Sequence, residues 1–207
     1  LNKKVNIKSI KVPINQWIFN EYIKTQNLVS RNIEIFRFDE ASKYAYQFVW
    51  HSYCDWYLEL SKTILFSDNK KDILETKEMA SYVFKEILVL LHPFIPFITE
   101  EIWLKNNLDS SNKNFLMLAN WPDEKVNKDK SSKDVEYLIH IISEIRSFKN
   151  ELNISPGSFI DVSMSKIDKK NREFLNKNET VLKKLGRISN FLPNDINKPS
   201  ASLVIKG

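Results

Sequence analysis

The stretch from residue 38 to residue 65 constrains the fold more than any other part of the sequence. Its apolar side chains recur at helical spacing, with Asp39 placed as an N-cap and Glu40 in the first turn. The main apolar row is formed by Ala41, Ala45, Phe48/Val49, Tyr53, Trp56, Leu60 and Ile64. A second row is formed by Tyr46, Trp50, Cys54 and Tyr57. A helix with two apolar sides must be covered by at least two neighbours, so this stretch predicts the centre of a helical bundle.

Three polar or reactive residues of this helix are candidates for chemistry. His51 and Asp55 are four residues apart, where they can form an intrahelical pair or act as a general base with its orienting carboxylate. No Ser or Cys nucleophile is placed to use them, which favours the simple pair. Cys54 is the only cysteine, so it cannot form an internal disulfide, and a small buried hydrophobe is the expected role.

Apolar periodicity and proline positions predict three further helices around the central one. They cover residues 13–36, 72–91 and 96–104, with Pro13 and Pro96 in first turns and Pro93 interrupting the chain between the last two. His92 is expected to form a local hydrogen bond, because a lone His is not a metal site. Four helices with short connections predict an antiparallel bundle.

The second half of the chain has a different pattern. Residues 115–121 indicate an apolar arm or strand laid on the bundle, and residues 123–133 are a charged linker. A helix over 134–152, strands over 159–164, 187–192 and 200–205, and a helix over 168–185 with a possible break at 176–178 and Gly186 as its stop complete the pattern. The predicted fold is mainly α, an antiparallel helical bundle (1–122) and a linker (123–133) followed by a small α/β appendage (134–207).

Composition restricts the classes of function. The net charge of +5 and pI of about 9.1 suit a polyanionic partner. No apolar run is long enough to span a membrane and no secretory signal opens the chain, so we expect a soluble, cytoplasmic monomer with no membrane partner. A self-contained enzyme is not expected either, because no nucleophile–base pair, metal cluster or phosphate-binding glycine loop is present, and no cofactor is predicted for this stretch.

One face of the first predicted helix has the residue types that bind single-stranded RNA. On a helical wheel its members fall within about 80° of one another, with no carboxylate between them. They are Trp17, Asn20, Lys24, Asn27 and Arg31, with Gln16 at the flank. An exposed aromatic ring can stack on a base, amides can contact base edges, and cations can neutralise phosphates. The alternative is an ordinary solvated face with Trp17 packed against the next helix.

Two segments carry a resemblance to a known family. The sequence FVWHSYCDWYLEL at residues 48–60 resembles a helix in the anticodon-binding domain of valyl-tRNA synthetases. The sequence LHPFIPFITEEIW at 91–103 is similar to a helix junction shared by the valine, isoleucine and leucine branch of class I synthetases. Residues 121–122 (WP) and 145–157 (IRSFKNELNISPG) also resemble the valyl pattern.

The resemblance implies that the chain is a C-terminal part of an ATP-dependent valine–tRNA ligase that grips the anticodon stem and loop of tRNA(Val). Neither a HIGH-like nor a KMSKS-like motif is found, so the ATP chemistry is expected upstream of Leu1 and this part is expected to be inactive alone. The resemblance also places the start of the first helix close to the anticodon. It therefore favours Trp17 stacking on an anticodon base, Gln16 and Asn20 at base edges, and Lys24 and Arg31 at phosphates.

Two residues of the appendage and two other classes of function complete the hypothesis. Arg146 and Lys149 are secondary candidates for contacts to the RNA backbone, with a solvated helix face as the alternative. The first rival function is the equivalent domain of an isoleucyl- or leucyl-tRNA synthetase. The second is a non-catalytic helical module that binds a protein partner through the Trp17 face.

Overall fold

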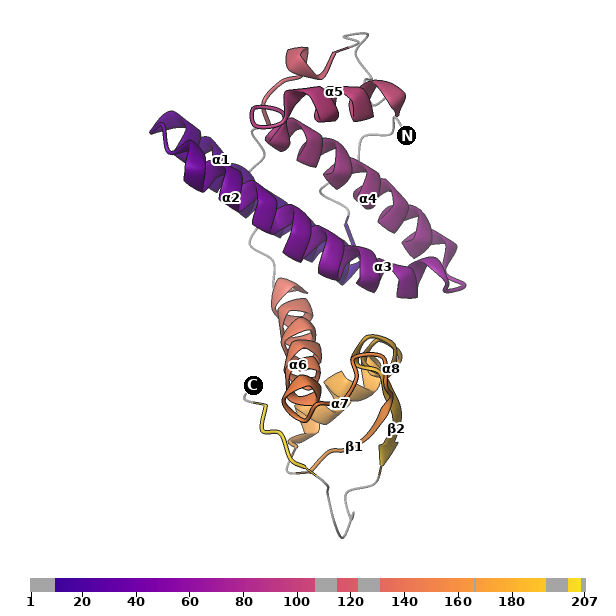
Figure 1. The fold of residues 1–207 in the computed structure, drawn as a ribbon. Coiled ribbons are helices and arrows are strands. Elements are labelled where there is room, and N and C mark those ends of the chain that lie inside the picture. The colour runs from indigo at the N-terminus through magenta and orange to yellow at the C-terminus, as the bar shows by residue number, and fades with distance from the viewer. Residues whose placement is uncertain (1–9, 107–114, 123–130, 166, 193–200, 206–207) are drawn as a thin grey trace. The chain divides into compact units, whose positions relative to one another are not determined.

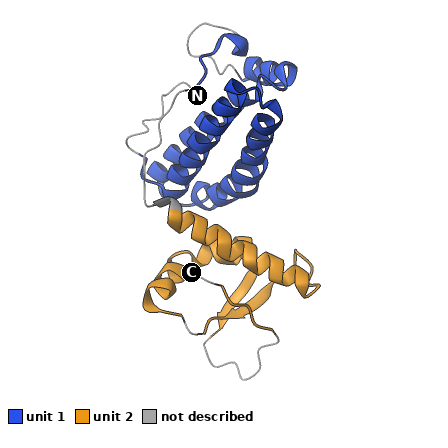
Figure 2. Ribbon diagram, turned by 90° about the vertical axis from the view of Figure 1, so that its left-hand side faces the viewer, with its two compact units in different colours: residues 1–132 blue, residues 133–207 orange. Residues whose placement is uncertain are grey.

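The computed structural model describes residues 10–106, 115–122, 131–165, 167–192 and 201–205. The chain divides into two compact units, Leu1–Ser132 and Lys133–Gly207, coloured separately in Figure 2. The division follows Ser132, at the end of the stretch predicted as a linker, most of which lies outside the described residues. No helix within the described ranges has the length and apolar composition needed to cross a membrane.

Unit 1 is a bundle of helices with short connections (Figure 1). Its elements are α1 (Pro13–Glu34), α2 (Phe38–Gln47), η2 (Phe48–Tyr57), α3 (Leu58–Leu65), α4 (Lys70–Leu91), α5 (Pro96–Lys105) and the short 3-10 turn η3 (Leu116–Leu118). The four predicted helices are confirmed, and prolines occupy the first turns of α1 and α5. The helix of residues 38–65 begins at Phe38, so Asp39 lies in its first turn instead of capping it. The arm predicted at residues 115–121 contains η3, not a strand.

The central helix runs without interruption through α2, η2 and α3, but its middle part is a π-helix. The buried positions reflect this, because Phe48 is followed by Tyr53 at a spacing of five residues and then by Tyr57. Tyr57 therefore enters the core that the predicted pattern assigned to Trp56. The second apolar row is buried only in part: Tyr57 is fully buried and Cys54 is half-buried. Tyr46 and Trp50 are exposed, with their rings stacked at a centroid distance of 6.3 Å.

A buried polar network joins the start of α1 to η2 and α4. The Asn15 side chain is fully buried and donates to Glu75 Oε1 at 3.0 Å and to Thr76 Oγ1 at 3.2 Å. Its carbonyl oxygen accepts a hydrogen bond from the Tyr57 hydroxyl at 2.9 Å. The Glu75 carboxylate also accepts from the backbone N–H groups of Lys11 and Val12, which precede α1. One asparagine thus fixes the position of three elements relative to one another.

Unit 2 is a small α/β fold. It consists of α6 (Ser131–Glu151), β1 (Ile160–Ser163), α7 (Lys169–Lys177), α8 (Glu179–Gly186) and β2 (Ile188–Leu192), with β1 and β2 paired in parallel. The helix break predicted at 176–178 is confirmed by the separation of α7 from α8 at Asn178, and Asp168 caps α7 as expected. The strand predicted at 200–205 is wrong, since residues 201–205 form no ladder with β1 or β2.

Candidate nucleic-acid interface

The RNA-binding face predicted on α1 is closed at its N-terminal half. Trp17 is 4% exposed and Asn20 is 6% exposed, so neither can stack on or hydrogen-bond to an external base as they stand. The expected exposure of these two residues is wrong. The physical reason is that α1 contacts α2, η2 and α4 at once. A helix covered by three neighbours buries a much wider arc than the single apolar row from which its outer face was predicted.

The other members of that face have local partners or remain exposed. Gln16 is half-buried and donates to the Ile10 carbonyl at 2.7 Å, which ties the segment before α1 to the helix. Lys24 is exposed and forms an ion pair with Glu21 one turn away. Asn27 is exposed and donates to the Ile23 carbonyl. Arg31 is exposed, and within the described residues no carboxylate pairs with it, so it is the member of this face best placed to meet a phosphate.

An exposed aromatic residue that the sequence pattern did not single out lies where α3 turns into α4, at the end of the bundle away from Arg31. Phe66 follows α3 and is 82% exposed, and Lys70 and Lys71 open α4 four and five residues later. Leu74 and Lys77 continue the Lys70 row along α4, and both are exposed. The available signal was a phenylalanine beside a run of polar residues, between the helices predicted at 38–65 and 72–91.

Carboxylates moderate the charge of this α3–α4 turn. Lys62 pairs with Glu59 within α3, and Asp72 accepts a hydrogen bond from the capping residue Asn69 at 2.8 Å. Asp68 is also exposed in the turn. The turn therefore combines an accessible ring with nearly equal numbers of cations and carboxylates. Base stacking would contribute more to RNA binding here than attraction to phosphates.

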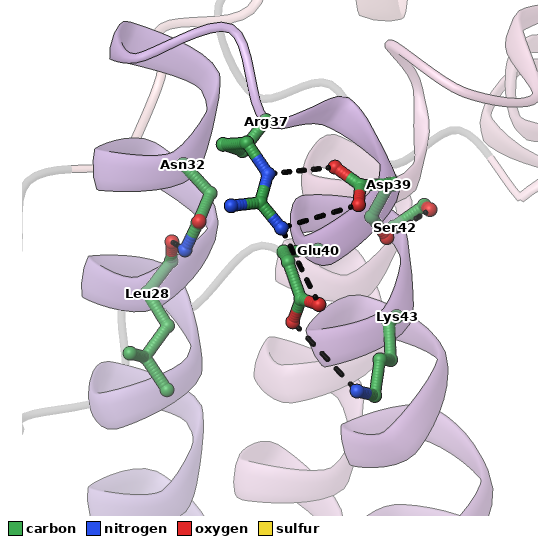
Figure 3. A network of polar contacts seen from close by, with 7 residues as sticks. All are labelled: Leu28, Asn32, Arg37, Asp39, Glu40, Ser42 and Lys43. Atoms are coloured by element: carbon green, nitrogen blue, oxygen red, sulfur yellow. Dashed lines mark hydrogen bonds and ion pairs between the residues drawn. The ribbon is translucent and has the colours of Figure 1, made fainter.

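The bundle end where α1 meets α2 has a different surface. An open groove of about 770 Å³ is lined by Ser30, Ile33, Glu34, Phe38, Ser42, Pro93, Phe94 and Trp121. No Lys or Arg is among these residues, and Glu34 is. Figure 3 shows the nearest basic network, in which Arg37 contacts Asp39 at 3.2 Å and lies 3.7 Å from Glu40, which in turn faces Lys43. The residues that line this groove therefore offer no cation to a phosphate.

The two predicted candidates in unit 2 have internal contacts. Arg146 donates from Nε and Nη2 to the Leu185 carbonyl at 3.1 and 3.0 Å, near the C-terminal end of α8. Lys149, expected on a solvated face, is only 3% exposed, and its ammonium donates to the carbonyls of Ser158 and Pro156. Burial, together with the charges of Arg187 and Arg146, lowers the pKa of Lys149. Lys149 stabilises the turn after α6 and is not available to RNA.

Residues considered for catalysis have structural contacts. His51 and Asp55 form the predicted intrahelical pair, at 3.4 Å, and His92 contacts the Thr99 hydroxyl at 2.9 Å. Cys54 is half-buried, and burial raises the pKa of its thiol. Across the part of the chain that the structure describes, no three His, Cys, Asp or Glu side chains are grouped to hold a metal ion.

Comparison with known proteins identifies the family. Residues 15–164 match the family model of the anticodon-binding domain of tRNA ligases. The chain belongs to this family. The match begins two residues into α1, covers the rest of the bundle of unit 1 and extends through α6 and β1 into unit 2. Both units therefore contribute to the anticodon-binding domain as the family defines it.

Several relatives of this anticodon-binding domain are valine–tRNA ligases. The chain is 56% identical to the enzyme of Pelagibacter ubique over 205 residues, which are 99% of the chain and 23% of that protein. It is 31% identical to the enzyme of Agrobacterium fabrum over 97% of the chain, and 36% identical to that of Bartonella quintana over 87% of the chain. The chain spans 20–23% of the length of these three relatives.

Proposed function

We propose that this chain is the anticodon-binding part of a valine–tRNA ligase and that it binds the anticodon stem and loop of tRNA(Val). The observation that carries the proposal is the 56% identity to a valine–tRNA ligase across 99% of the chain, together with the family match over residues 15–164.

The physical role of such a part is to supply binding energy far from the reacting atoms. Contacts to the anticodon position the tRNA so that its 3′ end reaches a catalytic domain, and they discriminate among tRNAs. In this proposal valine activation, ATP binding and transfer to tRNA belong to the remainder of a cytoplasmic, monomeric ligase. The chain by itself should then show no ATP–pyrophosphate exchange above background.

The α3–α4 turn is our candidate for the base contact in unit 1. Phe66 offers a ring that is 82% exposed, and the exposed Lys70 and Lys77 follow on one row of α4. A base unstacked from an RNA loop can lie on such a ring, a contact worth about 1–3 kcal/mol per base. The buried network of Asn15 and Tyr57 holds α1, η2 and α4 together close to this end, so the turn projects from a rigid support.

The test is the affinity of the full chain for a tRNA(Val) anticodon stem–loop at fixed salt, measured by fluorescence anisotropy. We expect Phe66→Ala to raise Kd by about tenfold, since it removes one stacking contact. Arg31→Gln tests the face predicted from the sequence, and Lys70→Gln removes the same charge at the turn. Lys105→Gln, on α5, is the control for loss of one surface cation.

The outcomes separate the competing hypotheses. Stem–loops from tRNA(Ile) and tRNA(Leu) should bind more weakly than that of tRNA(Val), and a reversed order would favour the other branches of the family. An unchanged Kd for Phe66→Ala with a raised Kd for Arg31→Gln would move the base contact to α1. No salt-sensitive binding to any of the three stem–loops would refute the proposed function.

A further inference from the structure

Most of the net positive charge of the chain is in unit 2. Residues 133–207 contain thirteen Lys and Arg against nine Asp and Glu, a net charge of +4 out of the +5 of the whole chain. Residues 1–132 contain eighteen against seventeen and are almost neutral. Since attraction to the phosphate backbone dominates the affinity of proteins for nucleic acids, the unit with the positive charge is where a backbone contact is expected.

Pairing of the two strands brings an arginine and an aromatic ring together at the surface of unit 2. Ile160 of β1 is the partner of Ile188 of β2, and the N–H of Ile160 donates to the carbonyl of Arg187 at 3.0 Å. The residues just before these partners, Phe159 and Arg187, are therefore neighbours. The Arg187 guanidinium lies 5.5 Å from the centre of the Phe159 ring, and that ring is 57% exposed.

Arg187 holds this position in an unfavourable backbone conformation. It follows α8 with φ 54° and ψ 52°, in the left-handed region where glycine is the usual residue. Gly186 is next to it but belongs to α8, and a Cβ there would come within 3.4 Å of the Ile188 side chain. Within the described residues the Arg187 guanidinium has no carboxylate partner. A strained, exposed arginine without an ion pair is a candidate for ligand binding.

The surroundings of Arg187 add positive charge. An open groove of about 610 Å³ is lined by Phe159, Glu179, Thr180, Lys183, Lys184, Arg187 and Ile188. Three of these are cations and one is a carboxylate, and Glu179 already pairs with Lys183 at 2.7 Å. Close to Arg187, the buried Lys149 is held by the backbone carbonyls of Pro156 and Ser158, and the exposed Arg146 donates to the carbonyl of Leu185.

We propose that this groove of unit 2, around Phe159, Lys184 and Arg187, is a second RNA-binding site that holds a phosphodiester of the tRNA backbone. Arg187 donates to the phosphate with its planar fork and Lys184 adds charge. The exposed part of the Phe159 ring receives the adjoining ribose or base. Nucleotide recognition and backbone attachment are thus divided between the two units, and the groove contributes affinity with little base specificity.

The test uses the full chain and intact tRNA(Val), so its choice of probe rests on the proposed function. Arg187→Gln should raise Kd about three- to tenfold at low salt and reduce the slope of log K against log salt by about 0.7–0.9, the value for one lost phosphate contact. Lys177→Gln, an exposed cation on α7 outside the groove, is the matched control and should change Kd less than about twofold. Arg187→Lys should restore part of the salt slope.

A stability measurement separates binding from folding. Arg187→Gly removes the strained side chain and should leave unit 2 at least as stable as in the wild type while weakening tRNA binding as much as Arg187→Gln does. If an RNA strand is the ligand, inorganic phosphate should compete with tRNA only at millimolar or higher concentration. Competition at micromolar concentration would indicate a site for a free anion and would contradict the proposal. Wild-type binding with unchanged Kd and salt slope in Arg187→Gln would refute the second site while leaving the proposed function intact.

Discussion

Replacing Tyr57 by Phe should destabilise unit 1 more than the loss of an ordinary hydrogen bond. The Tyr57 hydroxyl is fully buried and lies 2.9 Å from Asn15 Oδ1 and 3.3 Å from the Thr76 carbonyl. The Asn15 amide cannot turn over to compensate, because its nitrogen donates to Glu75 and Thr76 and a reversed amide would direct its oxygen at the Glu75 carboxylate. Tyr57→Phe therefore leaves a buried amide oxygen without a donor, which costs about 1–3 kcal/mol.

Tyr53→Phe provides the matched comparison four residues earlier. The Tyr53 hydroxyl donates to the Ala80 carbonyl at 3.1 Å, and this carbonyl, inside α4, also accepts the hydrogen bond of the helix itself. Its loss leaves no orphaned acceptor and should cost only about 0.5–1.5 kcal/mol. We therefore expect Tyr57→Phe to be the less stable variant by about 1 kcal/mol, and its melting temperature to fall by roughly 4–8 °C from that of the wild type for a total cost of about 2 kcal/mol.

Urea unfolding followed by tryptophan fluorescence measures this difference. All five tryptophans lie between positions 17 and 121, so their signal reports on unit 1. Equal slopes against urea in the three proteins would show that the same surface is exposed on unfolding. If the two variants differed by less than about 0.3 kcal/mol, or if Tyr57→Phe matched the wild type, the network around Asn15 would not have the energetic role assigned to it here.

The same tyrosines and one strained residue give two further predictions. Burial raises the pKa of Tyr53 to about 12 and raises that of Tyr57 further still. Above pH 10 the unfolded chain therefore loses protons that the folded chain keeps. The free energy of unfolding should fall as pH rises from 10 toward 12, and it should fall less steeply in Tyr57→Phe. A pH-independent stability over that range would contradict the burial of these hydroxyls. Phe36 follows α1 in left-handed geometry, with φ 60°, and its side chain is 80% exposed. Phe36→Gly should therefore stabilise unit 1 by about 0.5–1 kcal/mol in the same urea assay. A lower urea midpoint of unfolding in this variant would show that the Phe36 ring is needed for packing.

The helices of the bundle could be predicted because local signals agree with the tertiary fold. Prolines 13 and 96 start α1 and α5, and apolar periodicity located α4 and the central helix. In unit 2 the Asp168 cap and the break near residue 178 were also visible in the sequence. Each of these features depends on residues close together in the chain, so no knowledge of distant contacts was needed.

The candidate site was predicted less well, because exposure depends on neighbours that the sequence does not order in space. The wheel of α1 placed Trp17 beside Lys24 and Arg31, and only the packing of three elements around α1 shows that the ring is covered and the cations are not. The exposure of Lys149 was predicted wrongly for the same reason, since carbonyls in the turn at residues 155–158 accept hydrogen bonds from its ammonium. Conversely, Phe66 in its polar turn after α3 is 82% exposed, which the apolar pattern of the sequence did not indicate.

The sequence by itself determined that the chain forms a helical bundle followed by a small α/β unit, and its segment motifs indicated the family, because periodicity, caps and motifs are properties of neighbouring residues. Only the tertiary structure decided which aromatic rings and cations remain at the surface. It introduced the π-helix that places Tyr57 in the core, and it paired β1 with β2 so that Phe159 and Arg187 meet. Both outcomes come from contacts between residues far apart in the chain, and their energy outweighs the local preference of each segment.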